Sequence, residues 1–170
     1  PAVVAAFVNN MLKDLNYHIY CDSQIEWLDY ASHVGNKIYK YSLSLLLYVA
    51  CQELYPEHEL KVLHSLRNGR YCELRGEKTL GAADFAAIEG KMREMVQADQ
   101  PIKKDYLTRA DAIRYYQDIG SDLMAENLQM FAGNSVPVHT LDGHVQYMFS
   151  KIVPSTGYLS NFSIEGFDEG

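Results

Sequence analysis

Residues 37–54 read KIYKYSLSLLLYVACQEL, and this stretch decides the fold class. It is rich in apolar side chains and holds neither Gly nor Pro, which predicts a long helix that is amphipathic or buried. Gly35 breaks the pattern before the segment, and Pro56, which cannot continue a helix, ends it. We expect an antiparallel sheet to pack against this helix.

Two hairpin signals lie downstream of the helix. Asn68-Gly69 sits between alternating runs in residues 61–74, and Asp142-Gly143 is a second signal of the same kind. We therefore predict an α+β fold with one mainly antiparallel sheet that contains both hairpins. The other expected elements are helices at 82–98, 109–119 and 122–131 and strands at 102–107, 136–141, 144–152 and 158–164.

The first 30 residues form a separate pattern of short strands. Asn9-Asn10 predicts a tight turn, because Asn tolerates left-handed backbone, and residues 24–30 read as a further strand. We place the domain boundary so that residues 1–33 are the end of a small β-rich domain and residues 34–170 are the main domain. Because the chain starts without Met and stops soon after a strand-like stretch, we expect it to be a piece of a longer protein.

Charge and composition narrow the function classes. The chain has 15 Lys and Arg against 22 Asp and Glu, a formal charge of −7. Lys and Arg supply most nucleic-acid affinity, so this balance predicts no DNA partner and argues against tRNA. The longest apolar run, residues 45–51, is far shorter than the roughly 20 residues that a bilayer requires, so we expect no membrane contact. Three cysteines without CxxC spacing predict a reducing cytoplasm.

Two motifs that would carry chemistry are incomplete. A phosphate-binding loop needs Ser or Thr after Gly-Lys, but Gly90-Lys91 is followed by Met, so we expect no ATP site in this chain. His58-Glu59 opens like a zinc-protease motif, but the helical partner position, 62, is Val. We predict no metal and no catalytic residue.

Thirteen tyrosines are the unusual feature of the composition. Tyrosine joins a large apolar ring to a hydroxyl, which suits a half-polar cleft, a protein interface or a core with satisfied hydroxyls. If a cleft exists, Tyr48 and Tyr147 are candidates for its lining.

Several strings together resemble one family. Gln-Glu-Leu-Tyr-Pro (52–56), Asn-Gly-Arg-Tyr-Cys (68–72) and Val-Pro-Ser-Thr-Gly (153–157) occur in the order and spacing of the second additional domain shared by threonyl-tRNA synthetase and the alanyl-tRNA editing proteins. The resemblance covers about residues 35–165. It implies an α+β fold like that editing domain, and the strands before it resemble the end of a ubiquitin-like TGS domain.

The resemblance also places the editing motifs. In the editing proteins an HxxxH and a CxxxH motif build the cleft that hydrolyses mischarged aminoacyl-tRNA. The matching positions here are Tyr41, Leu45, Met148 and Ile152, and an expected acidic residue corresponds to Gln146. These side chains cannot hold a cation or activate water in the usual way, so we interpret the five positions as a degenerate editing site.

One group of relatives fits this loss. The helix motif at 39–48, Gly-Arg-Tyr-Cys-Glu-Leu (69–74) and Val-Pro-Ser-Thr-Gly-Tyr (153–158) resemble the module that precedes the P-loop domain of bacterial nucleoside (uridine) kinases. That resemblance implies a non-catalytic accessory or ligand-binding domain. Its expected partners are its own C-terminal kinase domain and a small nucleoside-type ligand, and ATP and Mg²⁺ would serve only the kinase domain. The alternative is an aminoacyl-tRNA editing (deacylase) domain of a threonyl-tRNA synthetase-like protein.

Overall fold

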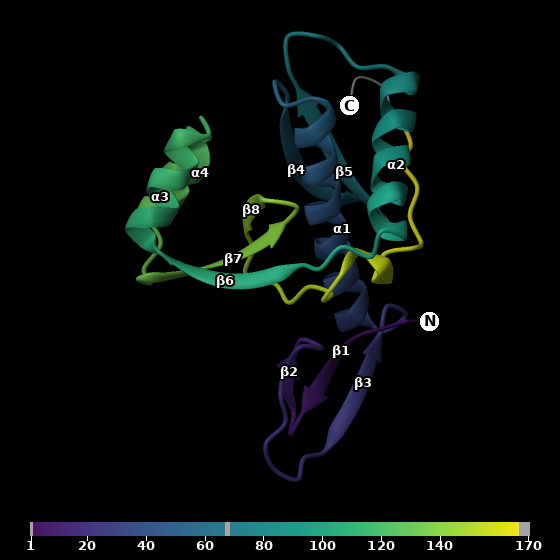
Figure 1. Cartoon of the computed structure of the whole chain (residues 1–170), viewed down its shortest axis with the longest axis vertical. Helices are drawn as coiled ribbons and strands as arrows, with labels where there is room; N and C mark the ends of the chain where they lie inside the picture. Colours follow the sequence, from purple (N-terminus) through teal and green to yellow (C-terminus); the bar gives the residue numbers. More distant parts are fainter. Residues whose placement is uncertain (1, 67–68, 167–170) are drawn as a thin grey trace. The chain divides into compact units, whose positions relative to one another are not determined.

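The computed structural model describes residues 2–66 and 69–166, and in it the chain divides into two units (Figure 1). One unit is built from residues up to Ile102 together with those from Ser150 onward, and the other is Lys103–Phe149. The fold is α+β with antiparallel strand pairing, as predicted. Its helices are α1 (His33–Leu54), α2 (Ala82–Gln97), α3 (Arg109–Asp118) and α4 (Asp122–Gln129). Its strands are β1 (Val3–Val8), β2 (Met11–Lys13), β3 (Ile25–Asp29), β4 (Glu59–Leu66), β5 (Gly69–Arg75), β6 (Lys103–Thr108), β7 (Ser135–Leu141) and β8 (His144–Tyr147).

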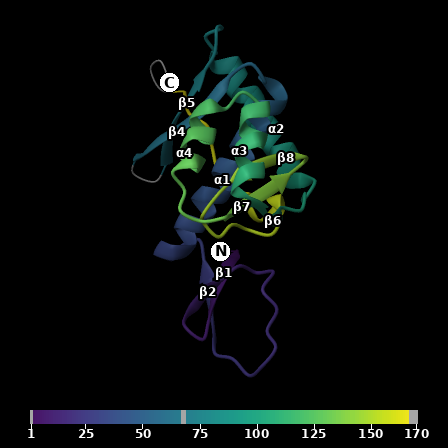
Figure 2. The ribbon, with the colours of Figure 1, turned by 90° about the vertical axis from the view of Figure 1, so that its left-hand side faces the viewer.

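The N-terminal strands form a three-stranded sheet of order β2-β1-β3 (Figure 1), and Figure 2 shows β1 and β2 from another side. The β1–β2 turn is the predicted one, since Asn9 and Asn10 have φ values of 49° and 64°. Val4 and Leu28 are buried. The domain boundary after residue 33 stays a prediction.

The long helix α1 starts earlier than the sequence suggests. Ser32 is its N-cap, and the Ser32 hydroxyl accepts a hydrogen bond from Gly35 N (3.1 Å), so Gly35 lies inside the first turn and does not break the helix. A Cβ at position 35 would lie 1.9 Å from Asp29 O. Glycine is therefore needed at this position for close approach of two backbones, and the interpretation of Gly35 as a helix breaker is wrong.

A two-stranded hairpin, β4–β5, follows α1, and α2 follows the hairpin (Figure 1). Gly69 starts β5 as predicted, while Asn68 lies outside the described residues. The α2 helix agrees with the predicted helix, and Asp84 caps its first turn by accepting from Gly81 N (2.8 Å).

The second unit is a three-stranded sheet of order β6-β7-β8 covered by α3 and α4. Thr108 caps α3 by accepting from Asp111 N (3.1 Å). The β7–β8 turn contains Asp142 and Gly143 at φ 48° and 80°, which confirms the second hairpin signal. The core of this unit is formed by Ala112, Tyr116, Ala125, Leu128, Val136 and Val138.

Three sequence predictions about strands are wrong. The two hairpins belong to different sheets, because β4 and β5 pair only with each other among the described strands. The predicted strand 144–152 ends at Tyr147. The predicted strand 158–164 is a short 3₁₀ turn, Thr156–Tyr158, and then irregular backbone whose polar groups bond to side chains of α1 and α2 instead of a strand.

Within residues 2–66 and 69–166, no helix combines the length and the apolar character that a bilayer span requires.

Candidate functional site

Ser42 on α1 links that helix to the segment that carries Ile152. Its buried hydroxyl donates to Ile38 O (2.8 Å) and accepts from Val153 N (3.0 Å). Leu45, about one turn further along α1, is 1% exposed, and Ile152 is 5% exposed. Two of the predicted editing positions therefore lie in the core of the same unit as buried aliphatic side chains.

Aliphatic side chains at these two positions have chemical consequences. Leu45 and Ile152 carry no lone pair that could bind a cation and no group that could accept a proton from water. Their burial stabilises the fold through apolar area removed from water. The structure gives both residues a packing role.

Tyr41 has different surroundings, although it lies on the same helix. The Arg70 guanidinium carbon is 4.4 Å from the centre of its ring, and Lys37 Nζ is 6.0 Å from the same centre. Both distances are within the range in which a cation is attracted to the face of an aromatic ring. Tyr48, two turns further along α1, is half-buried.

Gln146, Tyr147 and Met148 lie together in the second unit. Tyr116 is buried there, and its hydroxyl accepts from Tyr147 N (2.7 Å) and lies 3.4 Å from Gln146 Oε1, to which it donates. Burial raises the pKa of Tyr147. Met148 N donates to Pro137 O (3.3 Å). The bonds of Tyr116 join α3 to β8 and give Gln146 a structural partner, while the bond of Met148 joins the chain after β8 to β7.

The structure thus joins Ser42, one turn before Leu45, to Val153, the residue after Ile152, and it bonds Gln146 and Tyr147 to Tyr116 in the second unit. The proximity of Tyr41 to Met148 stays a prediction, because the two residues belong to different units.

The Val-Pro-Ser-Thr-Gly string is a structural joint. Thr156 is buried, its hydroxyl donates to Met95 O (2.6 Å), and the same oxygen accepts from Gln100 N (2.8 Å). Ser155 Oγ donates to Asp99 Oδ1 (2.5 Å). These bonds hold the string against the C-terminal end of α2 and the residues that follow it. The string therefore has a structural role.

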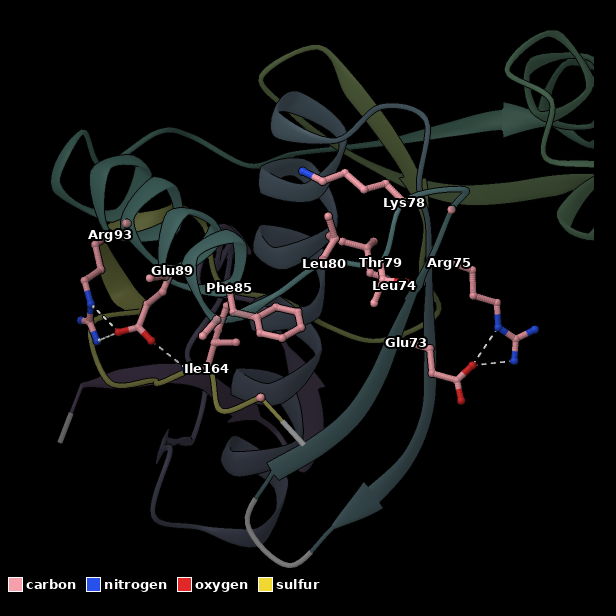
Figure 3. A pocket seen from close by; sticks show the side chains of 15 residues that line it. Glu73, Leu74, Arg75, Lys78, Thr79, Leu80, Phe85, Glu89, Arg93 and Ile164 are labelled. Carbon is pink, nitrogen blue, oxygen red and sulfur yellow. Dashed lines mark hydrogen bonds and ion pairs between the residues drawn. The ribbon is translucent and has the colours of Figure 1, made fainter. Parts of the chain in front are cut away.

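A pocket of about 1040 Å³ lies between β5, the following loop, α2 and the C-terminal segment (Figure 3). Phe85, Leu80 and Ile164 line it with apolar surface. Figure 3 shows two ion pairs on its walls: Arg75 Nε lies 2.8 Å from Glu73 Oε2, and Arg93 Nε lies 2.9 Å from Glu89 Oε1.

The third cation of this pocket is also paired. Lys78 Nζ lies 3.9 Å from Asp84 Oδ1. Each cationic side chain of the lining therefore has a carboxylate partner. Sequence reasoning missed this pocket because it forms where the C-terminal segment with Ile164 returns to residues 73–93, and no motif marks either stretch.

Histidines and acids do not gather into a metal site in the described part of the chain, where no group of three His, Cys, Asp or Glu is placed to hold an ion. His58 is buried, with Nε2 2.8 Å from Lys78 O and Nδ1 3.2 Å from Glu57. His64 stacks on Tyr71. The predicted absence of a metal stays a prediction.

The cysteines are free thiols in different environments. Cys21 is exposed and Cys51 is buried. Burial raises the pKa of Cys51 to about 12, with a smaller contribution from Cys72. Burial also raises the pKa of Cys72, against the opposing effect of Arg70. A protonated thiol is a poor nucleophile, so the structure gives Cys51 no catalytic role.

Comparison with known proteins gives one consistent result. The chain is 27% identical over 96% of its length to threonine–tRNA ligase of Francisella tularensis subsp. novicida, and 30% identical over 95% of its length to threonine–tRNA ligase of Parabacteroides distasonis. It spans 26% and 25% of these relatives, about a quarter of their length. No protein-family model matches the chain.

These relatives correct two predictions. The interpretation as an accessory domain of a nucleoside (uridine) kinase is wrong, because the similarity to threonine–tRNA ligases covers nearly the whole chain. The predictions that the partner is a C-terminal kinase domain and that tRNA is not a partner are wrong for the same reason. Loss of motif residues inside one domain carries no information about which domain is attached to it, and this is why the inference failed.

Proposed function

We propose that this chain is the editing-type module of a threonyl-tRNA synthetase-like protein and that it binds the acceptor end of tRNA. One observation carries the proposal: 95–96% of the chain matches proteins named threonine–tRNA ligase. The match extends over nearly the whole chain, which supports a fold shared with these relatives, and their printed name supports tRNA as the ligand.

We further propose that the module holds tRNA without hydrolysing its ester bond. Hydrolysis requires a group that activates water or a metal that polarises it. Leu45 and Ile152, at two of the positions that the resemblance assigns to the editing motifs, are buried aliphatic residues. Tyr41 has Arg70 and Lys37 beside its ring, an arrangement that suits it to binding an anion.

The charge of the chain limits the mode of binding. With a net charge of −7, most of the surface repels a polyanion, so contact with RNA is confined to local clusters of Lys and Arg. We propose the cytoplasm as the compartment, consistent with three free cysteines. We propose that the chain needs no cofactor of its own.

The test uses an acceptor-stem minihelix of threonine tRNA that carries the 3′-CCA end. Fluorescence anisotropy measures its binding to the whole chain at several salt concentrations, and a minihelix without CCA is the control. We expect binding that weakens as salt rises and that requires CCA. Equal affinity for both RNAs, or no binding at low salt, contradicts the proposal.

A second measurement addresses hydrolysis. The minihelix is charged with radiolabelled serine, and loss of the ester is followed with and without the protein. We expect the two rates to be equal. Faster loss with the protein restores the deacylase function and contradicts the non-hydrolytic part of the proposal alone.

A further inference from the structure

Two cations from different elements approach one tyrosine ring. Lys37 and Tyr41 are four residues apart on α1 and therefore share a face of the helix. Arg70, near the start of β5, places its guanidinium carbon 4.4 Å from the centre of the Tyr41 ring, and Lys37 Nζ lies 6.0 Å from that centre. We call Lys37, Tyr41 and Arg70 the cationic cluster.

The cationic cluster has no acidic counterpart among residues 2–66 and 69–166. Neither Lys37 nor Arg70 takes part in an ion pair there, whereas ion pairs with a Glu or Asp include those of Lys61, Arg75, Lys78, Lys91, Arg93, Arg114 and Lys151. Two cations that share a ring repel each other, and a chain with seven more acids than bases has carboxylates to spare for pairing. The positive charges of Lys37 and Arg70 are therefore not compensated by a carboxylate of the described residues, and an external anion could compensate them.

Arg70 shows a second sign of an absent partner. Its Nε is buried and has no hydrogen-bond acceptor within the described part of the chain. A buried donor without an acceptor destabilises the folded chain, and a charged donor does so more strongly than a neutral one. An anion bound to the guanidinium would satisfy this donor.

We propose that the cationic cluster binds a phosphate group. A guanidinium offers two parallel donors to a phosphate, a lysine adds a point charge, and the Tyr41 hydroxyl adds a third kind of donor. Phosphate has enough oxygens to accept from all three, whereas a carboxylate has two. The identification of the source as the tRNA backbone rests on the proposed function, while a free nucleotide presents the same chemistry.

The test separates the two sources. Inorganic phosphate, AMP and the uncharged CCA minihelix are titrated into the whole chain. The Arg70 Nε–H signal is followed by ¹H–¹⁵N NMR and affinity is measured by calorimetry. Sodium chloride at matched ionic strength controls for general screening. The variants are Arg70→Gln, Lys37→Gln and Tyr41→Phe.

Lys61→Gln is the matched control, because it removes one positive charge from β4 at a residue paired with Glu59 (3.3 Å). We expect phosphate probes to shift the Arg70 signal, and Arg70→Gln and Lys37→Gln each to weaken binding about tenfold. Tyr41→Phe weakens it less, and Lys61→Gln matches the wild type. Loss of one contact to single-stranded RNA should also lower the salt slope by about 0.7.

The outcomes are distinct for the two proposals. If AMP shifts the Arg70 signal but the minihelix does not bind, the phosphate site stands and the proposed function fails. If the minihelix binds equally to wild type, Arg70→Gln and Lys37→Gln, the phosphate site is overturned and the proposed function stands. No shift with any phosphate probe also overturns the site. If the Arg70→Gln variant does not fold, the affinity of the Lys37→Gln variant tests the phosphate site instead, because Lys37 is exposed on the surface of α1.

Discussion

Asp99 and Gly157 meet at a distance that only glycine permits. Gly157 N donates to Asp99 Oδ1 (3.0 Å), and a Cβ at position 157 would lie 2.3 Å from the same oxygen. Asp99 itself has a φ of 48°, in the left-handed region that residues other than glycine rarely adopt.

Gly157→Ala is therefore expected to destabilise the fold. Moving Asp99 away breaks its bonds to Gly157 N and Ser155 Oγ, at a cost of about 1–2 kcal/mol in the free energy of unfolding. Urea denaturation measures the change. Gly90→Ala is the control of opposite sign, because nothing lies within 4 Å of a Cβ there and alanine favours the helix by about 0.5–1 kcal/mol. Equal free energies of unfolding for the two variants would contradict a stabilising role of the contact between Asp99 and Gly157.

Ser42→Ala tests the link between α1 and the returning segment. The substitution leaves Val153 N without its acceptor in a buried site, so we expect a loss of about 1–3 kcal/mol in the free energy of unfolding. Ser44→Ala is the matched control on the same helix, since the Ser44 hydroxyl bonds only to Lys40 O among the described residues. If the two variants lose the same stability, Ser42 does not hold the segment.

Thiol reactivity should distinguish the exposed Cys21 from the buried Cys51. At pH 8 we expect a thiol reagent to modify the exposed Cys21 rapidly, and Cys51 only after unfolding, because Cys51 is buried and its pKa is about 12. Mass spectrometry of labelled peptides identifies the sites. Cys21→Ser should abolish the fast phase. Rapid labelling of Cys51 in the folded chain would show that the helix face around it opens.

Asp84 should make stability depend on pH in the acid range. The hydrogen bond from Gly81 N, then that from Tyr55, lowers the pKa of Asp84 below its usual 3.8. A lowered pKa stabilises the folded state above 3.8, and this contribution is lost as pH falls through the folded pKa. The stability difference between wild type and Asp84→Asn should therefore shrink below pH 4 in urea titrations. Tyr55→Phe should give an intermediate result, and a constant difference contradicts the argument.

The sequence predicts the helices and hairpins well because their signals are local. The Asn9-Asn10 and Asp142-Gly143 turns follow from backbone preferences of two residues, and α2 follows from apolar spacing. The role of Gly35 was missed because the contact that requires glycine, with Asp29 O, depends on how the chain folds back before α1. No local pattern encodes that approach.

The candidate site was harder to predict for the same reason. The resemblance to the editing proteins assigned Tyr41 and Leu45 to one motif. In the structure, Tyr41 lies beside two cations, whereas Leu45 lies in the core. Arg70 was not singled out, because nothing in the sequence relates β5 to α1. A cluster that joins distant segments leaves no periodic signal.

The way the chain leaves and re-enters the first unit has a consequence for folding order. Ile102 N donates to Pro154 O (2.8 Å), and Pro101 bridges to Ser155, so the exit and return points of Lys103–Phe149 are side by side. The entropy cost of closing a loop rises with its length, and a loop that has already folded is effectively short. Early folding of Lys103–Phe149 would therefore accelerate completion of the first unit. A mutation in the core of Lys103–Phe149 would then slow the folding of the sheet and helices of the first unit, which lie outside that stretch of sequence.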